Sequence, residues 1–210
     1  CMQVFQKKNI KWVIVLICIS IFVYLMQAVW GSHVLPIDTS VYNFAIKHFI
    51  SDTLTPIMIV ITQFGGTILM IVWAIASLVL ITNKRIAVIV VSNLVLIALL
   101  NNILKLIVRR ARPTGFRLIA ETGYSFPSGH SMVSMAFYGY LIYLIYKNVR
   151  NKKLRWTLMT CFSLLILIIG LSRIYLGVHY TSDVFAGFLF SLGYLVIYTK
   201  LTDPIVFLKK

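Results

Sequence analysis

Six apolar stretches, each about as long as a helix needs to be to cross a lipid bilayer, constrain this sequence more than any other feature. Apolar residues make up 60% of the chain and charged residues 12%, which is about half the charged share of a soluble domain. The sequence therefore predicts an all-α integral membrane protein, a bundle of six transmembrane helices in one domain over residues 1–210. The predicted helices cover residues 12–30, 56–81, 86–107, 130–147, 156–174 and 183–201.

The N-terminal quarter predicts a membrane helix followed by a helix at the interface. Trp12 and Trp30 flank the first stretch, and Trp is enriched where a transmembrane helix meets the headgroups. A cleaved signal peptide is the alternative, but the stretch is longer than a usual signal-peptide core and lacks a clear small-residue cleavage site, so we expect a retained helix. Residues 38–54 mix apolar with charged side chains, a pattern typical of a short amphipathic helix lying in the interface.

Charge predicts the orientation. Twenty Lys and Arg oppose five Asp and Glu, a net charge of +15. Nucleic acid is one partner for so basic a chain, but cytoplasmic loops of membrane proteins collect Lys and Arg, so we expect none here. With the N-terminus inside, the inner side would hold thirteen of the twenty: Lys7, Lys8, Lys11, Lys84, Arg85, Lys147, Arg150, Lys152, Lys153, Arg155, Lys200, Lys209 and Lys210. We therefore expect a multi-pass plasma-membrane protein with both termini in the cytoplasm.

Seven cations then lie on the outer side, against this bias: Lys47, Lys105, Arg109, Arg110, Arg112, Arg117 and Arg173. Lys105, Arg109 and Arg112 recur at helical spacing, so the sequence predicts that they share one helix face, which ends before Pro113. Cations that lean one way suit a phosphate, because Arg offers a planar fork and Lys a point charge. A basic helix end reaching for lipid headgroups is the simpler alternative.

The segment Pro127-Ser128-Gly129-His130 leads into the fourth predicted helix. Ser128 is a plausible N-cap, and the free N–H groups of a helix start form an anion site that Gly129 would let a ligand approach. His130 would lie in the first turn. An ordinary capped helix with an interfacial histidine is the alternative.

His179 and Asp183 lie four residues apart between the fifth and sixth predicted helices, so one helical turn can bring them together. Thr181 or Ser182 could cap the sixth helix, with His179 just before it. A carboxylate that accepts one ring N–H leaves the other ring nitrogen free to attack. Arg173 adds a cation nearby. The alternative is a polar pair that satisfies itself at a helix junction.

In the six-helix topology all three segments fall on the outer face, where two His, one Asp and at least three cations predict phosphoryl transfer. No His, Cys or carboxylate cluster has metal-ligand spacing, so we expect no metal and no cofactor. Together, Lys105-x6-Arg112-Pro113, Pro127-Ser128-Gly129-His130 and Ser172-Arg173-x5-His179-x3-Asp183 resemble the three-part motif of the type 2 phosphatidic acid phosphatase superfamily. Its members are membrane lipid phosphate phosphatases, and they share a core fold with vanadium haloperoxidases.

The resemblance implies a role for each motif residue. His179 would attack phosphorus to form a phosphohistidine, Asp183 would orient it, and His130 would protonate the leaving oxygen. Lys105, Arg112 and Arg173, with backbone N–H groups near Ser128 and Gly129, would hold the phosphate oxygens. Arg109, Arg110 and Arg117 lie outside the motif, and we expect them to attract headgroups.

The expected partners are membrane lipids and a lipid phosphate substrate: undecaprenyl pyrophosphate or phosphatidylglycerophosphate first, phosphatidic acid as a further candidate. Three other functions stay open from the residues. An anion transporter would also gather cations at a membrane mouth, although it would usually carry polar residues deeper in several helices. Asn101 and Asn102 are the main candidates for such residues, and bonds between helices are their simpler role. A non-catalytic lipid-binding protein and a vanadate-dependent oxidase are the others.

Overall fold

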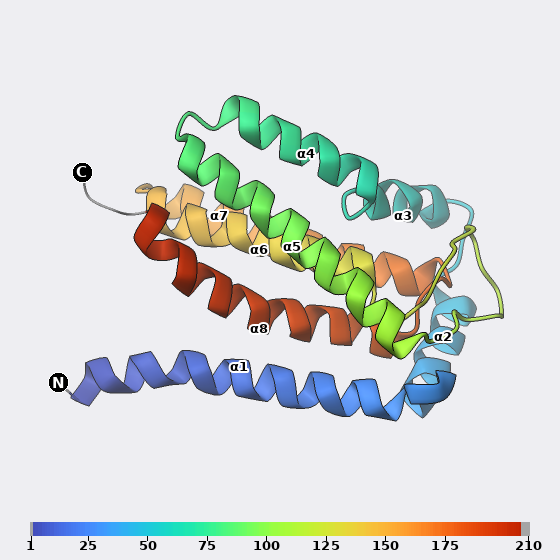
Figure 1. Ribbon diagram of the computed structural model, residues 1–210. Helices are drawn as coiled ribbons and strands as arrows, with labels where there is room; N and C mark the ends of the chain where they lie inside the picture. Colours follow the sequence, from blue (N-terminus) through green and yellow to red (C-terminus); the bar gives the residue numbers. More distant parts are fainter. Residues whose placement is uncertain (1, 207–210) are drawn as a thin grey trace.

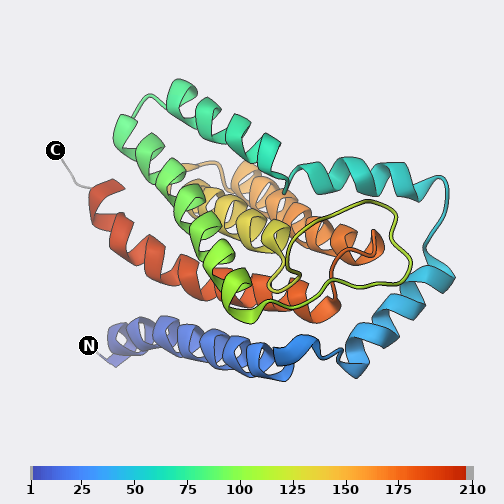
Figure 2. The same ribbon diagram turned by 45° about the vertical axis from the view of Figure 1, so that its right-hand side comes forward.

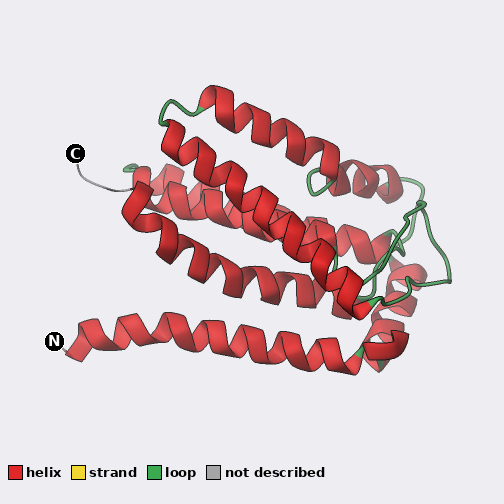
Figure 3. Cartoon of the chain, in the orientation of Figure 1, coloured by secondary structure: helices red, strands yellow, loops and turns green. Residues whose placement is uncertain are grey.

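The structure is a computed structural model that describes the backbone of residues 2–206 and the side chains of residues 10–206. Every regular element in this part of the chain is helical (Figure 3). The helices are α1 (Met2–Ala28), a single 3₁₀ turn (Trp30–Ser32), α2 (Pro36–His48), α3 (Leu54–Gln63), α4 (Thr67–Leu80), α5 (Lys84–Val108), α6 (Gly129–Asn148), α7 (Lys152–Tyr175) and α8 (Thr181–Val206).

The bundle is built around α6, which packs against α5, α7 and α8 (Figure 1). On the outside of this group, α1 lies along α8, α4 lies along α5, and α3 lies against α7. Aromatic side chains fill much of the core, where Tyr140 meets Tyr198 edge to face and Phe137 meets Tyr138 in the same way. Such pairs add packing energy beyond the area that they bury.

The outward surface of the bundle is apolar, as a surface in contact with hydrocarbon must be. On α4, the exposed fractions of Ile68, Val79 and Leu80 are 79%, 69% and 77%. Within the described residues, four helices are long and apolar enough to cross a membrane, and the bent pair α3–α4 makes a fifth candidate. A chain with several such helices is a multi-pass membrane protein, which confirms the predicted all-α membrane fold.

Two of the six predicted membrane helices differ from expectation. The helix expected over 56–81 is broken, since α3 and α4 meet at 44° across residues 64–66. The backbone oxygen of Phe64, which the break frees, accepts a hydrogen bond from the Tyr138 hydroxyl at 2.8 Å. Gly65 allows the break to pass close to α7, because a Cβ there would lie 2.8 Å from a methyl group of Ile169. The other difference is α6, which spans the predicted length but is not among the strongly apolar candidates; neighbouring helices cover it.

The predicted amphipathic helix exists as α2, but it begins earlier, at Pro36, and ends at His48. Pro at the first helical position fits, because that N–H would lack a helical partner anyway. Asp38, the first residue of the predicted amphipathic segment, is buried, with 1% of its surface exposed, and its carboxylate accepts a hydrogen bond from the backbone N–H of Leu35 at 3.1 Å.

Both ends of the described chain lie at one end of the bundle, and α2 lies at the other, with the long loop of residues 109–128 (Figures 1 and 2). Helix α5 ends, α6 begins, α7 ends and α8 begins at this loop end. The three sequence motifs therefore meet in space, as the topology predicted. Lys209 and Lys210, which contribute to the predicted inner charge, lie outside the described residues.

Candidate active site

His179 lies in the tight connection between α7 and α8, and 2% of its surface is exposed. Its Nε2 is 3.1 Å from Nη1 of Arg112. A guanidinium nitrogen only donates, so Nε2 accepts this bond with its lone pair and the proton of the neutral ring lies on Nδ1. Burial, the largest influence, lowers the pKa of His179 to about 4; Asp183 raises it, while Arg173 and Arg112 lower it further. His179 is therefore a neutral base at physiological pH, with its lone pair on Nε2.

Asp183 faces the protonated side of this ring. Its Oδ2 lies 3.5 Å from Nδ1 of His179 and accepts hydrogen bonds from the Ser125 hydroxyl at 2.5 Å and the Tyr180 backbone N–H at 2.9 Å. The Ser125 hydroxyl is also 3.3 Å from His179 Nδ1. The side chain of Asp183, rather than that of Thr181 or Ser182, therefore accepts a hydrogen bond from the backbone at the start of α8. The pairing of His179 with Asp183 that the four-residue spacing predicted is present.

Arg112 reaches His179 from the loop and not from a helix. Helix α5 ends at Val108, and Arg109 adopts the left-handed conformation with φ 51°, so the predicted shared face of Lys105, Arg109 and Arg112 does not form. Arg109 points back to the exposed surface and donates to the Leu106 carbonyl at 2.9 Å. Arg112 is held by the carbonyl oxygens of its own loop and by that of Val178, at 3.0 Å.

Lys105, on the last turn of α5, donates through Nζ to the carbonyl of Tyr124. It is partly buried, and it interacts electrostatically with Arg112, Asp183, Glu121 and Arg173. Lys105 and Arg112 of the first motif and Arg173 of the third therefore lie close together, although Arg112 lies in a loop and not on a helix.

His130 lies in the first turn of α6, as predicted, and Ser128 is the N-cap. The Ser128 hydroxyl accepts from the Ser131 N–H at 3.4 Å, and the Ser128 N–H donates to the Asp183 carbonyl at 3.1 Å. Because that N–H is already bonded, the N–H groups of Gly129 and His130 are the ones available to an anion at this helix start. Gly129 fits tightly, since a Cβ there would meet Asn101 Oδ1 at 3.0 Å.

Arg173 is buried near the end of α7. Its Nη1 donates to the Thr62 hydroxyl at 2.8 Å, and its Nη2 forms an ion pair with Glu121. Glu121 was not singled out from the sequence. Burial acts to raise its pKa, but Arg173 and Arg112 outweigh it, so the net pKa lies below the ordinary value. A charged carboxylate therefore lies against the cations that the motif assigns to phosphate.

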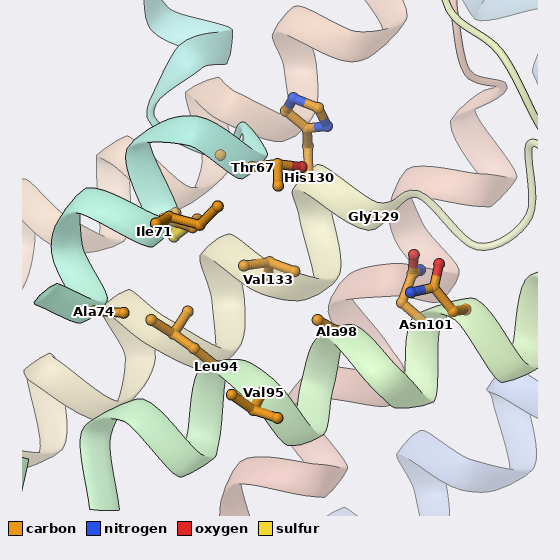
Figure 4. Close-up of a pocket in the computed structure, with 13 residues that line it drawn as sticks. Thr67, Ile71, Ala74, Leu94, Val95, Ala98, Asn101, Gly129, His130 and Val133 are labelled. Carbon is orange, nitrogen blue, oxygen red and sulfur yellow. The ribbon is translucent and has the colours of Figure 1, made fainter. Parts of the chain in front are cut away.

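A polar cavity of about 410 Å³ lies over these groups, lined in part by Glu121, His130 and Arg173. An apolar cavity of about 350 Å³ lies on the other side of His130, between α4, α5 and α6 (Figure 4). Figure 4 shows His130 and Asn101 at its rim and Leu94, Val95 and Ala98 along its wall. His130 and Thr67 line both cavities, so a ligand with a polar head and an apolar tail could use both.

The expectation that Arg110 attracts headgroups is wrong. Arg110 is completely buried; its Nη1 donates to Asp183 Oδ1 at 2.6 Å and its Nη2 to Asp38 Oδ2 at 2.8 Å. Of the other two cations outside the motif, Arg109 is exposed and Arg117 donates to the Pro113 carbonyl. Asn101 bonds between elements, as the simpler interpretation predicted, through its amide donating to the Pro127 carbonyl at 3.2 Å.

The sequence therefore missed three residues of the site: Asp38, Arg110 and Glu121. The sequence held one signal for these residues. The chain has only five acidic residues, and a carboxylate near a membrane helix needs a partner. Three of the five, Asp38, Glu121 and Asp183, form ion pairs with arginines at this end of the bundle.

A buried histidine base, its carboxylate, a second histidine at a helix start and a group of cations are together the groups that a phosphoryl-transfer site uses. The model of the PAP2 superfamily matches residues 86–205, more than half of the chain. The chain belongs to the PAP2 superfamily, which confirms the resemblance that the motifs indicated.

Individual relatives agree with this membership. The chain is similar to phosphatidylglycerophosphatase B of Bacillus subtilis, with 38% identity over 48% of this chain; it spans about half of that relative's length, 49%. It is also similar to an undecaprenyl-diphosphatase of Sulfolobus acidocaldarius, with 24% identity over 95% of this chain and 96% of the relative. The crystal structure of a transmembrane PAP2 type phosphatidylglycerolphosphate phosphatase from Bacillus subtilis has the same fold, with a TM-score of 0.82, 24% identity, and coverage of 91% of this chain and 96% of that one.

Proposed function

We propose that this chain is a membrane phosphatase that hydrolyses a lipid mono- or pyrophosphate through a phosphohistidine on His179. The observation that carries the proposal is the orientation of the His179 ring: Nε2 meets Arg112 at 3.1 Å with its lone pair, while Nδ1 faces Asp183. A neutral ring nitrogen beside a phosphate-binding cation suits phosphoryl transfer to histidine, because a bound phosphate can replace Nε2 as the acceptor of Arg112 and leave the lone pair free to attack.

In the first step, Nε2 forms a bond to phosphorus while the bond between phosphorus and the leaving oxygen breaks. This oxygen belongs to the lipid alcohol of a monophosphate or to the lipid phosphate of a pyrophosphate. The negative charge of the bound phosphate favours a proton on His130, and His130 gives this proton to the leaving oxygen. Asp183 offsets the positive charge that develops on the His179 ring. In the second step, His130 removes a proton from water, the water oxygen attacks phosphorus, and the bond to Nε2 breaks. Inorganic phosphate is released and both histidines return to their starting state.

Cations and N–H groups stabilise the charge on the phosphoryl oxygens. Arg112, Arg173 and Lys105 supply positive charge, and the first turn of α6 supplies the N–H groups of Gly129 and His130. Glu121 competes with a bound phosphate for the charge of Arg173, because it already forms an ion pair with that guanidinium group.

The two cavities that meet at His130 support a lipid substrate. Phosphate fits the polar cavity beside Arg173, and the apolar cavity between α4 and α5 suits a hydrocarbon tail. Each buried methylene contributes about 0.8 kcal/mol, so the tail would supply much of the binding. Undecaprenyl pyrophosphate and phosphatidylglycerophosphate are the leading candidates, in keeping with the names of the relatives; phosphatidic acid is the third.

We place the site at the outer face of the plasma membrane and both termini in the cytoplasm. The basis is the distribution of Lys and Arg, which favours the end of the bundle that holds the termini. The loop of residues 109–128 would then face outward.

The test is phosphate release by the purified full-length protein from a panel of lipid phosphates in vesicles. His179→Ala should lower kcat at least about a thousandfold, since it removes the nucleophile. His48→Ala, which changes an exposed histidine at the end of α2, is the matched control and should keep full activity. Lipid binding without phosphate release would favour a binding protein, and phosphate or lipid movement across the vesicle without hydrolysis would favour a transporter.

A further inference from the structure

A second buried carboxylate, Asp38 of α2, is joined to Asp183 through one guanidinium group. Arg110 donates from Nη1 to Asp183 Oδ1 at 2.6 Å and from Nη2 to Asp38 Oδ2 at 2.8 Å. The exposed fractions of Asp38, Arg110 and Asp183 are 1%, 0% and 0%. The carboxylate that faces the proposed nucleophile is therefore held by Arg110 of the loop after α5, and through Arg110 it is joined to α2, far away in the sequence.

Neighbouring groups fix this arrangement from several directions. Ser182 donates to Asp38 with both its N–H, at 2.8 Å, and its hydroxyl, at 2.9 Å. Arg110 donates further to the His33 carbonyl at 2.7 Å, and its guanidinium carbon lies 4.1 Å from the centre of the Tyr180 ring. Helices α2 and α8 thus clamp one arginine between them, and its orientation sets that of Asp183.

The charges of this cluster do not cancel. One arginine against two carboxylates leaves a net charge of −1 with almost no access to water. Burying unbalanced charge is costly unless something compensates for it. The compensating charge is available on His179, whose ring becomes positive when phosphorus bonds to Nε2 and whose Nδ1 lies 3.5 Å from Asp183.

We infer that Asp38 and Arg110 are positioning residues for the phosphoryl-transfer reaction: Arg110 orients Asp183, and Asp38 offsets the charge of Arg110 so that Asp183 keeps its full negative charge for His179. This inference rests on the proposed function. Without Asp38, Arg110 and Asp183 would neutralise each other, and the positive charge on His179 would meet a neutral pair. Neither residue touches the substrate.

The effect should therefore fall on kcat and not on KM. Asp38→Asn keeps the shape and removes one charge, and kcat should fall on the order of 10–100-fold while KM changes less than about threefold, because the lost interaction acts in the transition state. The matched control is Asp52→Asn, which removes the same charge from an exposed position beside α3 and should leave kcat unchanged. Arg109→Gln is the corresponding control for Arg110→Gln.

A double variant separates charge from structure. The net charge of the cluster is −1 in the wild type, 0 in Asp38→Asn, and −1 again in Asp38→Asn/Arg110→Gln. The double variant should therefore be several-fold more active than Asp38→Asn. If Asp38 only anchors α2, removing its partner as well should leave activity as low or lower.

The experiment measures kcat and KM of full-length variants in vesicles. The burst of a single turnover counts the sites that become phosphorylated, and kcat is expressed per such site, so that misfolded protein is not counted. Failure of the wild type to release phosphate would overturn the proposed function. A wild type that is active, together with an Asp38→Asn variant of unchanged kcat, would overturn this inference alone, as would a double variant no better than Asp38→Asn. A partial recovery with KM unchanged would support it.

Discussion

Gly177→Ala is expected to disable the site although Gly177 carries no chemistry. Gly177 follows α7, two residues before His179, and has φ 71°. A Cβ at this position would lie 2.2 Å from the backbone oxygen of Phe116. The loop of residues 109–128 thus rests directly on the turn that presents His179, and its Leu118 N–H donates to the Leu176 carbonyl beside it, at 3.1 Å.

Gly177→Ala combines two effects, a strained backbone conformation and a steric clash with Phe116. Gly123→Ala has the first effect alone and therefore separates the two. Gly123 has φ 72°, but no heavy atom of the described residues lies within 4 Å of a Cβ built there. Both substitutions force a side chain into the left-handed region, at about 1–2 kcal/mol. Only at Gly177 must the backbone also move, by about 1 Å, to relieve the contact. A shift of that size at a reacting group costs roughly a hundredfold in rate.

The assay compares kcat and the thermal unfolding midpoint of the two variants in the same detergent. Both should lose stability, and Gly177→Ala should lose more. Gly123→Ala should keep kcat within a few-fold of the wild type, whereas Gly177→Ala should fall about a hundredfold per folded molecule. Equal kcat values for the two variants would refute the argument, because they would mean that the Phe116 contact does not hold His179 in place.

Three further predictions concern charge and topology. Glu121→Gln should free Arg173 and strengthen inhibition by inorganic phosphate or vanadate about tenfold, because a charge-assisted hydrogen bond is worth about 1.5–3 kcal/mol; Asp52→Asn is the control, and an unchanged inhibition constant would contradict the competition. The pKa of His179 is lowered to about 4, so the unfolded chain binds its proton first, and this residue's contribution to stability should be lost as pH falls from about 6.5 to 4. In the pH profile of kcat/KM, corrected for substrate ionisation, the acidic limb that belongs to His179 should have an apparent pKa near 4. An apparent pKa near 6.5 would show that the nucleophile is exposed. Cys introduced at Thr122, in a background without native cysteines, should react with a membrane-impermeant thiol reagent in intact cells, and labelling only after lysis would invert the topology.

The helices were predictable because a membrane imposes one strong rule. A backbone in hydrocarbon must satisfy its own hydrogen bonds, so long apolar stretches have to be helices. Five of the six predicted stretches lie on single helices with shifted ends. The sixth is broken at Phe64–Gly66, where the freed backbone oxygen bonds to Tyr138. That partner belongs to a distant helix, so hydropathy along the chain could not reveal the break.

The end of α5 shows a second limit of local reasoning. Helical spacing predicted one face for Lys105, Arg109 and Arg112, but Arg109 turns into the left-handed region. The loop can leave the helix there because carbonyls of its own residues and of Val178 hold Arg112. Lys105 and Arg112 still lie in one neighbourhood beside His179, whereas Arg109 is exposed, so the prediction of one shared helix face for the three cations was wrong.

The sequence by itself determined the class of fold, the meeting of three motifs at one end of the bundle, and the pairing of His179 with Asp183, because apolar length and short spacings act locally. Only the tertiary structure decided which charges face one another. Arg110 and Arg109 are neighbours in sequence, yet one is buried between Asp38 and Asp183 and the other is exposed. The physical reason is that a buried charge is stable only with a partner, and α2 and α8 bring that partner from far along the chain.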